Sequence, residues 1–187
     1  MGVFVASRKI SIRATACCSQ TRISYRSMSP HLSWLILLLF VATQGIALGA
    51  GLYEQRIVVP QWMGRAGSGE PYLDAAAMRA ADTGRRFWGF VTTGPLTLLT
   101  LASLGAAWQA QGALQAWWLG SALVTLVERI ATFGYFIPVA IRLMRAEAPV
   151  PASVRAQALQ WRNFNRARLA LSGLALLLGL MALSPPL

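Results

Sequence analysis

Residues 31–53 read HLSWLILLLFVATQGIALGAGLY, and this run contains no Asp, Glu, Lys or Arg. A helix of roughly 20 apolar residues is long enough to cross the hydrocarbon core of a bilayer. The polar stripe that an amphipathic helix of a soluble protein would show is missing from this run. The stretch therefore predicts a transmembrane helix.

The rest of the chain agrees with a membrane protein. Of its 187 residues, 56% are hydrophobic and only 12% are charged, whereas roughly a quarter are charged in an average soluble domain. Three more apolar stretches follow the first, the last of them behind a polar helical lead-in. We predict an all-α fold, an integral membrane four-helix bundle in one domain over residues 31–187, with spans at about 31–53, 87–108, 114–143 and 162–183.

Residues 1–30 form a tail that is rich in Arg and Ser and has no acidic residue. We expect it to be disordered or to result from a wrongly assigned start, since Met28 opens MSPHLSWLILLLF directly before the first span. The alternative is an organellar targeting segment, which has a similar composition.

The net charge of +11 follows membrane topology. The arginines gather at helix ends and form no soluble basic face, so we expect no nucleic-acid partner. Ten of the positive residues lie in the first and third connections, five lie in the tail, and the other connection and the C-terminus have none. The positive-inside rule then places both large loops in the cytoplasm and both termini outside, as in a multi-pass protein of a bacterial inner membrane.

Metal and cofactor ligands are scarce. His31 is the only histidine, which argues against haem, copper and di-iron sites within one chain. The two cysteines, Cys17 and Cys18, are adjacent and form no CxxC pair at a span end. A carboxylate metal site would need Glu54 and Glu128 together. We therefore expect no metal and no cofactor.

The third span contains two adjacent charges, Glu128 and Arg129. Neighbours on a helix point about 100° apart, so we expect each to find its own partner. Hydrogen-bonding side chains share the face of Glu128, at Ser121, Thr125, Thr132 and Tyr135. Aromatic rings, Phe133 and Phe136, share that of Arg129, so the guanidinium is expected to stack on them.

The fourth helix offers partners if it pairs antiparallel with the third. Its Trp161, Asn165 and Arg168 recur on one helical face. An unpaired charge in the bilayer costs roughly 3 kcal/mol on insertion scales, so such residues are expected to face the bundle interior. We predict a buried cluster of Glu128, Thr132, Tyr135, Asn165 and Arg168, with Glu54, Arg129, Arg162 and Arg166 near its cytoplasmic mouth. The alternative is an interhelical salt bridge that only fixes the packing.

Several local features predict where elements begin, end or meet. We expect Pro60 to end the first helix, residues 63–74 to form a flexible loop, and Ser153 to cap the fourth helix. The spacing of Gly45 and Gly49 is typical of helices that approach closely.

Two further features lie before and within the second span. Asp74 can cap a short helix that lies along the membrane surface and ends at Gly84. Pro95 predicts a kink whose freed carbonyls Thr92 and Thr93 could satisfy.

Four segments resemble the anthrone-oxygenase-like family of small four-helix membrane proteins, over about residues 35–183. They read YEQRIVVPQW, GRRFWGFVTTGPLTLL, YFIPVAIRLM and WRNFNRARLALSGLALL. Family members show Thr-Asn after the proline of the third segment, where this chain has Val139 and Ala140. They show His or Asn before the final arginine of the fourth, where Asn165 stands.

The resemblance implies a cofactor-independent oxygenase that converts a flat, lipophilic, anthrone-like or phenolic substrate into a quinone. In that chemistry Glu128 would be the base, Arg129 or Arg168 would hold the enolate oxygen, and Asn165 and Tyr135 would orient the substrate. Trp88, Phe133 and Phe136 could sandwich a flat ring. Other substrate contacts are expected from Thr132, Trp161 and Glu54.

A non-enzymatic protein is the alternative. It would be a small carrier of a lipophilic anion, or an accessory subunit that assembles with a partner or as a homo-oligomer. Its mechanism would still use Glu128. Many carriers are built from two related halves, and no repeat is visible in this chain.

Overall fold

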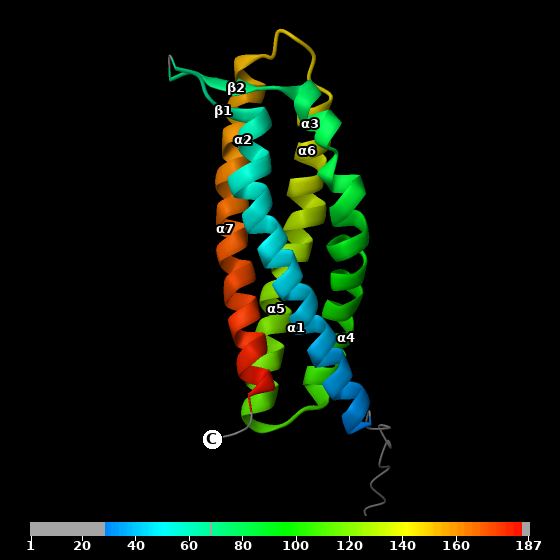
Figure 1. The fold of residues 1–187 in the computed structure, drawn as a ribbon. Coiled ribbons are helices and arrows are strands. Elements are labelled where there is room, and N and C mark those ends of the chain that lie inside the picture. Colours follow the sequence, from blue (N-terminus) through cyan, green and yellow to red (C-terminus); the bar gives the residue numbers. More distant parts are fainter. Residues whose placement is uncertain (1–28, 68, 185–187) are drawn as a thin grey trace, which may run out of the picture.

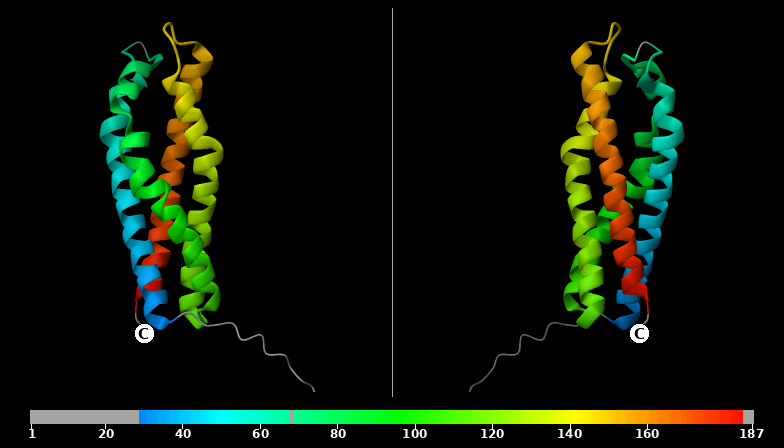
Figure 2. Two further views of the ribbon diagram at one scale, coloured as in Figure 1. Left: turned by 90° about the vertical axis from the view of Figure 1, so that its right-hand side faces the viewer. Right: turned by 90° about the vertical axis from the view of Figure 1, so that its left-hand side faces the viewer.

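The computed structural model describes residues 29–67 and 69–184. The predicted tail lies outside these residues except for Ser29 and Pro30, and so do Cys17 and Cys18. Within the described residues four helical rods run side by side along an elongated bundle, over Pro30–Trp62, Gly84–Gln109, Gly112–Met144 and Ala152–Leu183 (Figures 1 and 2). Each rod is long and apolar enough to cross a membrane. The predicted all-α bundle is confirmed.

Three of the rods combine α-helical and π-helical segments. The first consists of α1 (Pro30–Tyr53), the π-helical η1 (Glu54–Val58) and α2 (Val59–Trp62). The second consists of the π-helical η2 (Gly84–Thr93) and α4 (Pro95–Gln109). The third consists of α5 (Gly112–Ala131), the π-helical η3 (Thr132–Phe136) and α6 (Ile137–Met144). The fourth is the single helix α7 (Ala152–Leu183).

A proline follows each π-helical segment at the same distance. Pro60, Pro95 and Pro138 each stand two residues after the last π-helical residue. Proline has no N–H to donate, and its ring clashes with the carbonyl four residues earlier, so the helix widens before it. The helix therefore passes through Pro60 and continues to Trp62, which corrects the expectation that it ends there.

The first connection is an ordered structure. Strands β1 (Met63–Arg65) and β2 (Pro71–Leu73) pair antiparallel, with Met63 opposite Leu73. The short helix α3 (Ala75–Ala81) follows, and Asp74 Oδ1 accepts from the backbone N–H of Ala77 at 2.9 Å. The predicted cap is confirmed, whereas the predicted flexible loop is wrong because backbone pairing and burial of Met63 and Leu73 fix it.

The cap predicted for the fourth helix is also wrong. Helix α7 begins at Ala152, one residue before Ser153, and Pro151 stands at the cap position without a side-chain hydrogen bond. Proline suits this place because its fixed φ leads into a helix.

Close helix approach occurs at other glycines than expected. A Cβ at Gly51 would come within 2.5 Å of Leu169 Cδ2, and one at Gly179 within 2.8 Å of Val41 Cγ2. Nothing lies within 4 Å of the Cβ positions at Gly45 and Gly49. Helices α1 and α7 therefore meet where these two other glycines remove the side chain.

The bundle has two apolar cores with a polar layer between them. One core joins Phe40, Leu96 and Trp118 near the chain ends, and the other joins Trp62, Leu143 and Trp161 near the hairpin. Buried polar side chains between them include Gln44, Ser121, Thr125, Glu128, Arg129 and Thr132. Membrane helices bury such groups only where partners satisfy them.

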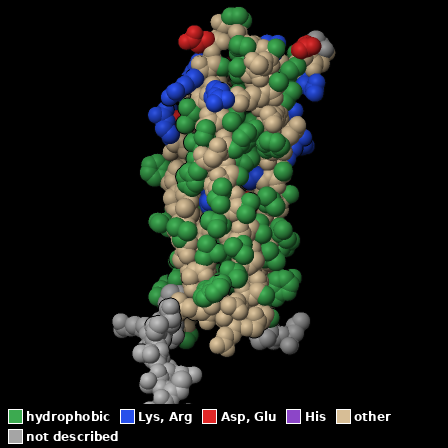
Figure 3. Space-filling view, turned by 180° about the vertical axis from the view of Figure 1, so that it is seen from behind, with side chains coloured by type: hydrophobic (Ala, Val, Ile, Leu, Met, Phe, Trp, Pro, Cys, Tyr) green, Lys and Arg blue, Asp and Glu red, His purple; other side chains and the backbone are tan. Residues whose placement is uncertain are grey.

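The outer surface of the bundle is apolar over most of its length. Exposed side chains such as Leu98, Val127 and Leu177 point away from the core. Figure 3 shows hydrophobic side chains along the length of one face and the charged ones toward the hairpin end. The protein is a multi-pass membrane protein whose outer side chains contact lipid.

The rods are longer than a bilayer requires. At about 1.5 Å per residue, helices of 26 to 33 residues exceed the roughly 30 Å of a hydrocarbon core. The rods are therefore longer than a hydrocarbon core, and most of the described charged residues lie toward the hairpin end (Figure 3).

Candidate functional site

A cavity of about 610 Å³ lies between the rods in the charged half of the bundle. Its wall includes seven of the eleven residues predicted for the site, namely Glu54, Trp88, Arg129, Thr132, Phe136, Trp161 and Arg168. Glu128, Phe133, Tyr135 and Asn165 are not in the wall. The volume is in the usual range for a small-molecule site.

All three π-helical segments border this cavity. η1 contributes Glu54, η2 contributes Trp88 and Thr92, and η3 contributes Thr132 and Phe136. A π-helical turn bulges from the regular helix and is frequent at functional sites. The prolines that widen the three rods thus also shape one cavity.

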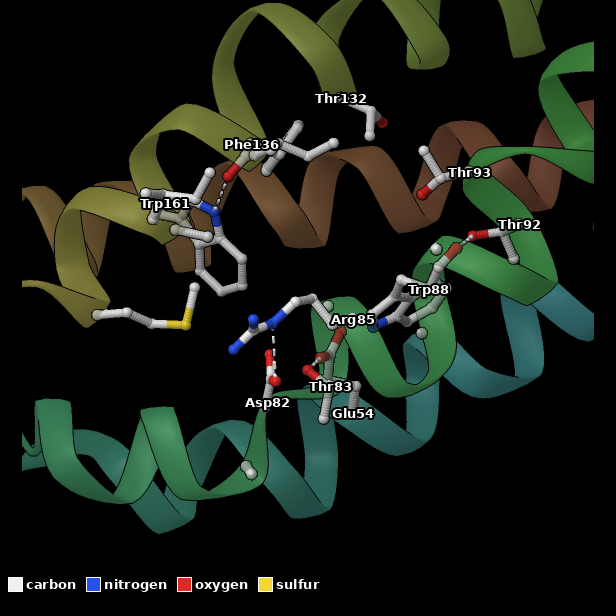
Figure 4. Close-up of a pocket in the computed structure, with 18 of the residues that line it drawn as sticks. Glu54, Asp82, Thr83, Arg85, Trp88, Thr92, Thr93, Thr132, Phe136 and Trp161 are labelled. Atoms are coloured by element: carbon white, nitrogen blue, oxygen red, sulfur yellow. Dashed lines mark hydrogen bonds and ion pairs between the residues drawn. The ribbon is translucent and has the colours of Figure 1, made fainter.

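Aromatic rings form one side of the cavity (Figure 4). Trp161 Nε1 donates to the backbone carbonyl of Phe136 at 3.3 Å, which fixes the indole ring. The ring centroid of Trp161 lies 5.9 Å from that of Trp62 and 6.2 Å from that of Phe136. Trp88 lies on the other side, so flat rings face the space from both sides.

Arg168 stacks on this aromatic wall. Its Cζ atom lies 4.7 Å from the centroid of the Phe136 ring, and its Nη1 donates to Thr132 Oγ1 at 3.5 Å. Stacking was expected for Arg129 instead. That expectation is wrong because Phe133, one of the two rings it relied on, points outward with 48% of its surface exposed.

Arg129 is buried in the wall and only partly paired. It is 7% exposed, and its Nε atom has no hydrogen-bond partner among the described residues. Its Nη2 atom lies 3.9 Å from Glu128 Oε2. The two neighbours therefore form a long ion pair, so the expectation of separate partners is wrong for Arg129, whereas Glu128 has its own partner in Ser172. The guanidinium therefore brings a buried positive charge to the wall of the cavity.

Glu128 lies behind the wall. Ser172 Oγ lies 2.9 Å from its Oε1 and 3.1 Å from its Oε2, and donates to this carboxylate. This serine lies one helical turn beyond Arg168, the last of the fourth-helix residues predicted to contact Glu128. Helical side chains lean toward the N-terminus of their own helix, so that of Glu128 leans toward the N-terminus of α5. Because α7 runs antiparallel to α5, this direction points toward the C-terminal part of α7. Glu128 therefore meets a residue of α7 with a higher number than predicted.

Glu54 is a carboxylate that lines the cavity. It is 8% exposed, and its Oε1 accepts from Thr83 Oγ1 at 2.6 Å. Arg168 interacts electrostatically with both Glu54 and Glu128. This arginine therefore connects the carboxylate in the wall with the carboxylate behind it.

Asn165 and Tyr135 face other neighbours. Asn165 is fully buried, and its Nδ2 donates to Gln55 Oε1 at 2.9 Å, which ties α7 to η1. The Tyr135 ring packs against Phe136 and Phe164, and its buried hydroxyl has no hydrogen-bond partner among the described residues. The structure does not bring these two side chains together with the arginines of the cavity.

Charged side chains surround the outer end of the cavity. Arg85 Nε lies 3.0 Å from Asp82 Oδ2, and both residues are in the wall. Arg79 donates through Nη1 to the backbone carbonyl of Met144, which joins α3 to α6. Arg79 and Arg145 are exposed. An anion that approaches from this end meets positive charge first.

Among the wall residues that were not predicted from the sequence are Trp62, Thr83 and Ser172. Ser172 carries a usable signal, because it follows Arg168 by four residues and is a polar residue in an apolar run. Trp62 and Thr83 carry none. They reach the cavity only because the first helix continues past Pro60 and because Thr83 starts the second rod beside Glu54.

A second cavity, of about 360 Å³, lies at the opposite end of the bundle. Its wall contains Trp34, Leu37, Leu114 and Trp118, and no charged side chain among the described residues. The first cavity is therefore the better candidate for chemistry.

The described residues contain no group of three His, Cys, Asp or Glu side chains placed to hold a metal ion. No protein-family model matches the chain, and neither the curated proteins nor the solved structures contain a match to it.

Proposed function

We propose that the cavity binds a flat, lipophilic phenol, enol or anthrone as its oxyanion, and that the protein is a cofactor-independent oxygenase of such a substrate. One observation carries the proposal. Arg129 and Arg168 line the same cavity as the rings of Trp88, Phe136 and Trp161. Rings accept a flat apolar body, and guanidinium groups accept an oxyanion.

The chemistry needs little beyond these groups. Loss of a proton from the ring CH2 of an anthrone leaves an enolate, which the arginines stabilise electrostatically. The enolate carbon reacts with dioxygen to give a hydroperoxide, and loss of water from it leaves the quinone. One molecule of dioxygen is consumed and one of water is released. The protein has to supply a proton acceptor, positive charge and a site that excludes water.

The sidedness of the protein belongs to the same proposal. Ten Lys and Arg residues of the two large connections lie at the hairpin end of the rods, and the positive-inside rule assigns this end to the cytoplasm. Both termini are then outside. The substrate enters the cavity from the cytoplasmic leaflet or from the water beside it.

The test is oxygen uptake by the purified protein in detergent with a panel of anthrones and hydroquinones. We expect uptake with at least one anthrone, and a loss of at least about tenfold in Arg168→Ala, the size expected when an oxyanion loses a charged donor. Arg142→Ala is the matched control, because Arg142 is exposed on α6 and is not in the cavity wall. Its uptake should equal that of the parent protein.

Two results would overturn the oxygenase proposal. The first is no uptake with any substrate by folded protein. The second is equal uptake by the parent and Arg168→Ala, which would place the reaction outside this cavity. A folded but inactive Glu128→Gln variant would not decide the matter alone, because Glu128 also holds Arg129.

A carrier of lipophilic anions is the second candidate. The position of Glu128 behind the wall favours it, because carriage needs an anion site but no base. Vesicles that contain the protein would then move a fluorescent aryl sulfonate across the bilayer without consuming oxygen. The oxygenase would instead show uptake of oxygen without transport.

A further inference from the structure

Some residues of the cavity wall also belong to the outer surface of the bundle, and these mark the mouth of the cavity. On η2 they include Gly84, Arg85 and Gly89, and on the third rod they include Ile141 and Arg145. All five are exposed. The mouth is therefore a slot between the second and the third rod.

The oblique course of the second rod opens this slot. Within the bundle α4 packs against α5, whereas η2 packs against α1. The left view of Figure 2 shows the same course, because the green rod starts beside the first rod and ends beside the third. The second and third rods thus meet in the half near the chain ends and separate in the charged half.

Packing limits the slot at both of its ends. Toward the hairpin, α3 packs against α6, and Arg79 donates through Nη1 to the backbone carbonyl of Met144. Toward the chain ends, Leu96 of α4 and Trp118 of α5 belong to the same apolar core. A molecule that passes through the slot therefore moves sideways, across the rods and not along them.

The edges of the slot change from charged to apolar along its length. Three arginines stand at the hairpin end, and one of them pairs with Asp82. Small and apolar side chains follow on both edges, from η2 and from α6. The arginines are Arg79, Arg85 and Arg145, and the small and apolar residues are Gly89, Thr93, Ile137, Ala140 and Ile141.

The apolar part of the slot faces lipid. Phe90, which directly follows Gly89, is 79% exposed, and Ile141 is 40% exposed. Large apolar side chains remain exposed on the spans of a membrane protein because hydrocarbon, and not water, surrounds them. The cavity that contains Arg129 and Arg168 thus opens to the hydrocarbon of the bilayer.

Glycine keeps the η2 edge of the slot free of side chains. A Cβ added at Gly89 would lie 3.6 Å from the carbonyl oxygen of Gly84, which is an ordinary contact. A Cβ added at Gly94 would likewise lie 3.7 Å from the carbonyl oxygen of Gly89. The backbone therefore accepts a side chain at either position. A side chain at Gly89 would occupy the slot, whereas Gly94 is not in the cavity wall.

We propose that the substrate of this cavity is a flat phenol or enol with a long apolar chain, and that the chain leaves the cavity through the slot and remains in the bilayer. This inference rests on the proposed binding of an oxyanion. The ring lies between Trp88 and Trp161, with its oxygen near Arg129 and Arg168. The chain stays in hydrocarbon, so the substrate reaches the cavity by diffusion within the leaflet and does not have to dissolve in water.

The test compares two ligands with the same ring, 2-naphthol and 6-dodecyl-2-naphthol. Binding to the purified protein in detergent is measured by quenching of tryptophan fluorescence, because Trp88 and Trp161 line the cavity. The variant Gly89→Leu places a side chain in the slot. We expect it to weaken binding of the dodecyl ligand about tenfold more than binding of 2-naphthol, since extra methylene groups in an occupied space are costly.

Gly94→Leu is the matched control. It makes the same substitution at an exposed glycine of the same rod, outside the cavity wall. We expect it to keep the ratio of the two affinities that the parent protein shows. Both ligands partition into the same micelles with all three proteins, so this partitioning cancels when the ratios are compared.

A second measurement uses the parent protein alone and needs no variant to fold. A 2-naphthol with a diazirine midway along its dodecyl chain is irradiated with the protein, with and without an excess of 2-naphthol. Mass spectrometry then locates the adducts. Adducts that the excess removes lie near the chain of the bound ligand, and we expect them in η2 and α6.

The outcomes separate the inference from the proposed function. Equal weakening of both ligands in Gly89→Leu, or the same change of the ratio in Gly94→Leu, would overturn the inference and leave binding in the cavity intact. Removable adducts that lie outside the second and third rods would also overturn it. Failure of both ligands to bind the parent protein would overturn the proposed function instead.

Discussion

Single residues determine how the charges of this site are held, and Ser172 is an example. Its hydroxyl donates to the buried carboxylate of Glu128, 3% exposed. The carboxylate in turn lies near Arg129, which lines the cavity. Loss of one hydroxyl on α7 would therefore disturb an arginine on another rod.

We expect Ser172→Ala to lower the free energy of unfolding by about 1–3 kcal/mol, because it leaves a buried acceptor without its donor. Unfolding in mixed micelles, followed by far-UV circular dichroism, measures the loss. Ser184→Ala is the control, since that serine is exposed and bonds only to Leu180 of its own helix. An unchanged unfolding free energy in Ser172→Ala would show that water or another group replaces the hydroxyl.

The sequence predicts which residue types belong to the site more reliably than it predicts their contacts. Buried charges in a span must face the interior, and Glu128, Arg129 and Arg168 do so. Their partners depend on rotation and offset between two helices, which no local pattern records. About two helical turns separate Asn165, a predicted neighbour of Glu128, from Ser172, the observed one.

At the scale of elements, two glycines set the distance between α1 and α7. We expect Gly51→Ala to destabilise the protein by about 1–3 kcal/mol, because the added methyl group would overlap Leu169. Gly45→Ala on the same helix is the matched control. It has open space around its Cβ position and should be neutral or slightly stabilising. The free energy of unfolding of both variants measures the difference.

A second variant separates overlap from other effects of the substitution. Leu169→Ala in the Gly51→Ala background removes the overlapping atoms and should recover part of the lost stability. No recovery would show that the cost arises elsewhere, for example at Trp88, which also lies near the Gly51 Cβ position.

The three prolines predict that the helices are disturbed, but not that each helix continues through its proline. Pro60 was expected to end a helix and Pro95 to kink one. In the bundle the helix continues at Pro60, Pro95 and Pro138, and the strain is taken up by a π-helical segment before each. Packing against neighbouring rods keeps each helix continuous at its proline. Because this packing is a tertiary effect, the local sequence does not predict it.

The whole molecule is polarised along its length. The described charged residues lie toward the hairpin end, while both ends of the described chain lie at the opposite end (Figure 1). Exposed apolar side chains cover the part of the bundle between these two ends, on all sides.

We expect a reporter fused to the C-terminus to be outside the cytoplasm. Alkaline phosphatase, which folds only outside, should be active there, and green fluorescent protein should be dark when exported unfolded. Fusions after Arg145, in the connection between the third and fourth rods, are the control and should give the reverse pattern. The same pattern at both positions would contradict a fourth rod that crosses the membrane, and a full reversal would contradict the assigned orientation.

At this scale the sequence is most informative. Four apolar runs, counted by length, predict four rods, and all four are present. The predicted apolar spans, 31–53 and 162–183, are shorter than the helices that contain them, which run to Trp62 and from Ala152, close to the helix ends expected at Pro60 and Ser153. Hydropathy marks the part of a helix that lies in lipid, whereas hydrogen bonding and packing continue the helix beyond it.

The shape of the cavity also depends on the number of residues in each π-helical segment. A π-helical turn holds one residue more than an α-helical turn and absorbs it as a bulge, without rotating the helix on either side. In η3 the exposed Gly134 touches no other element at its Cβ position. Deletion of this one glycine would remove the residue that the bulge of η3 absorbs and would flatten the wall at Thr132 and Phe136, although Pro138 would still interrupt the hydrogen bonding of the helix. The cavity could thus be lost while every side chain that lines it is still present.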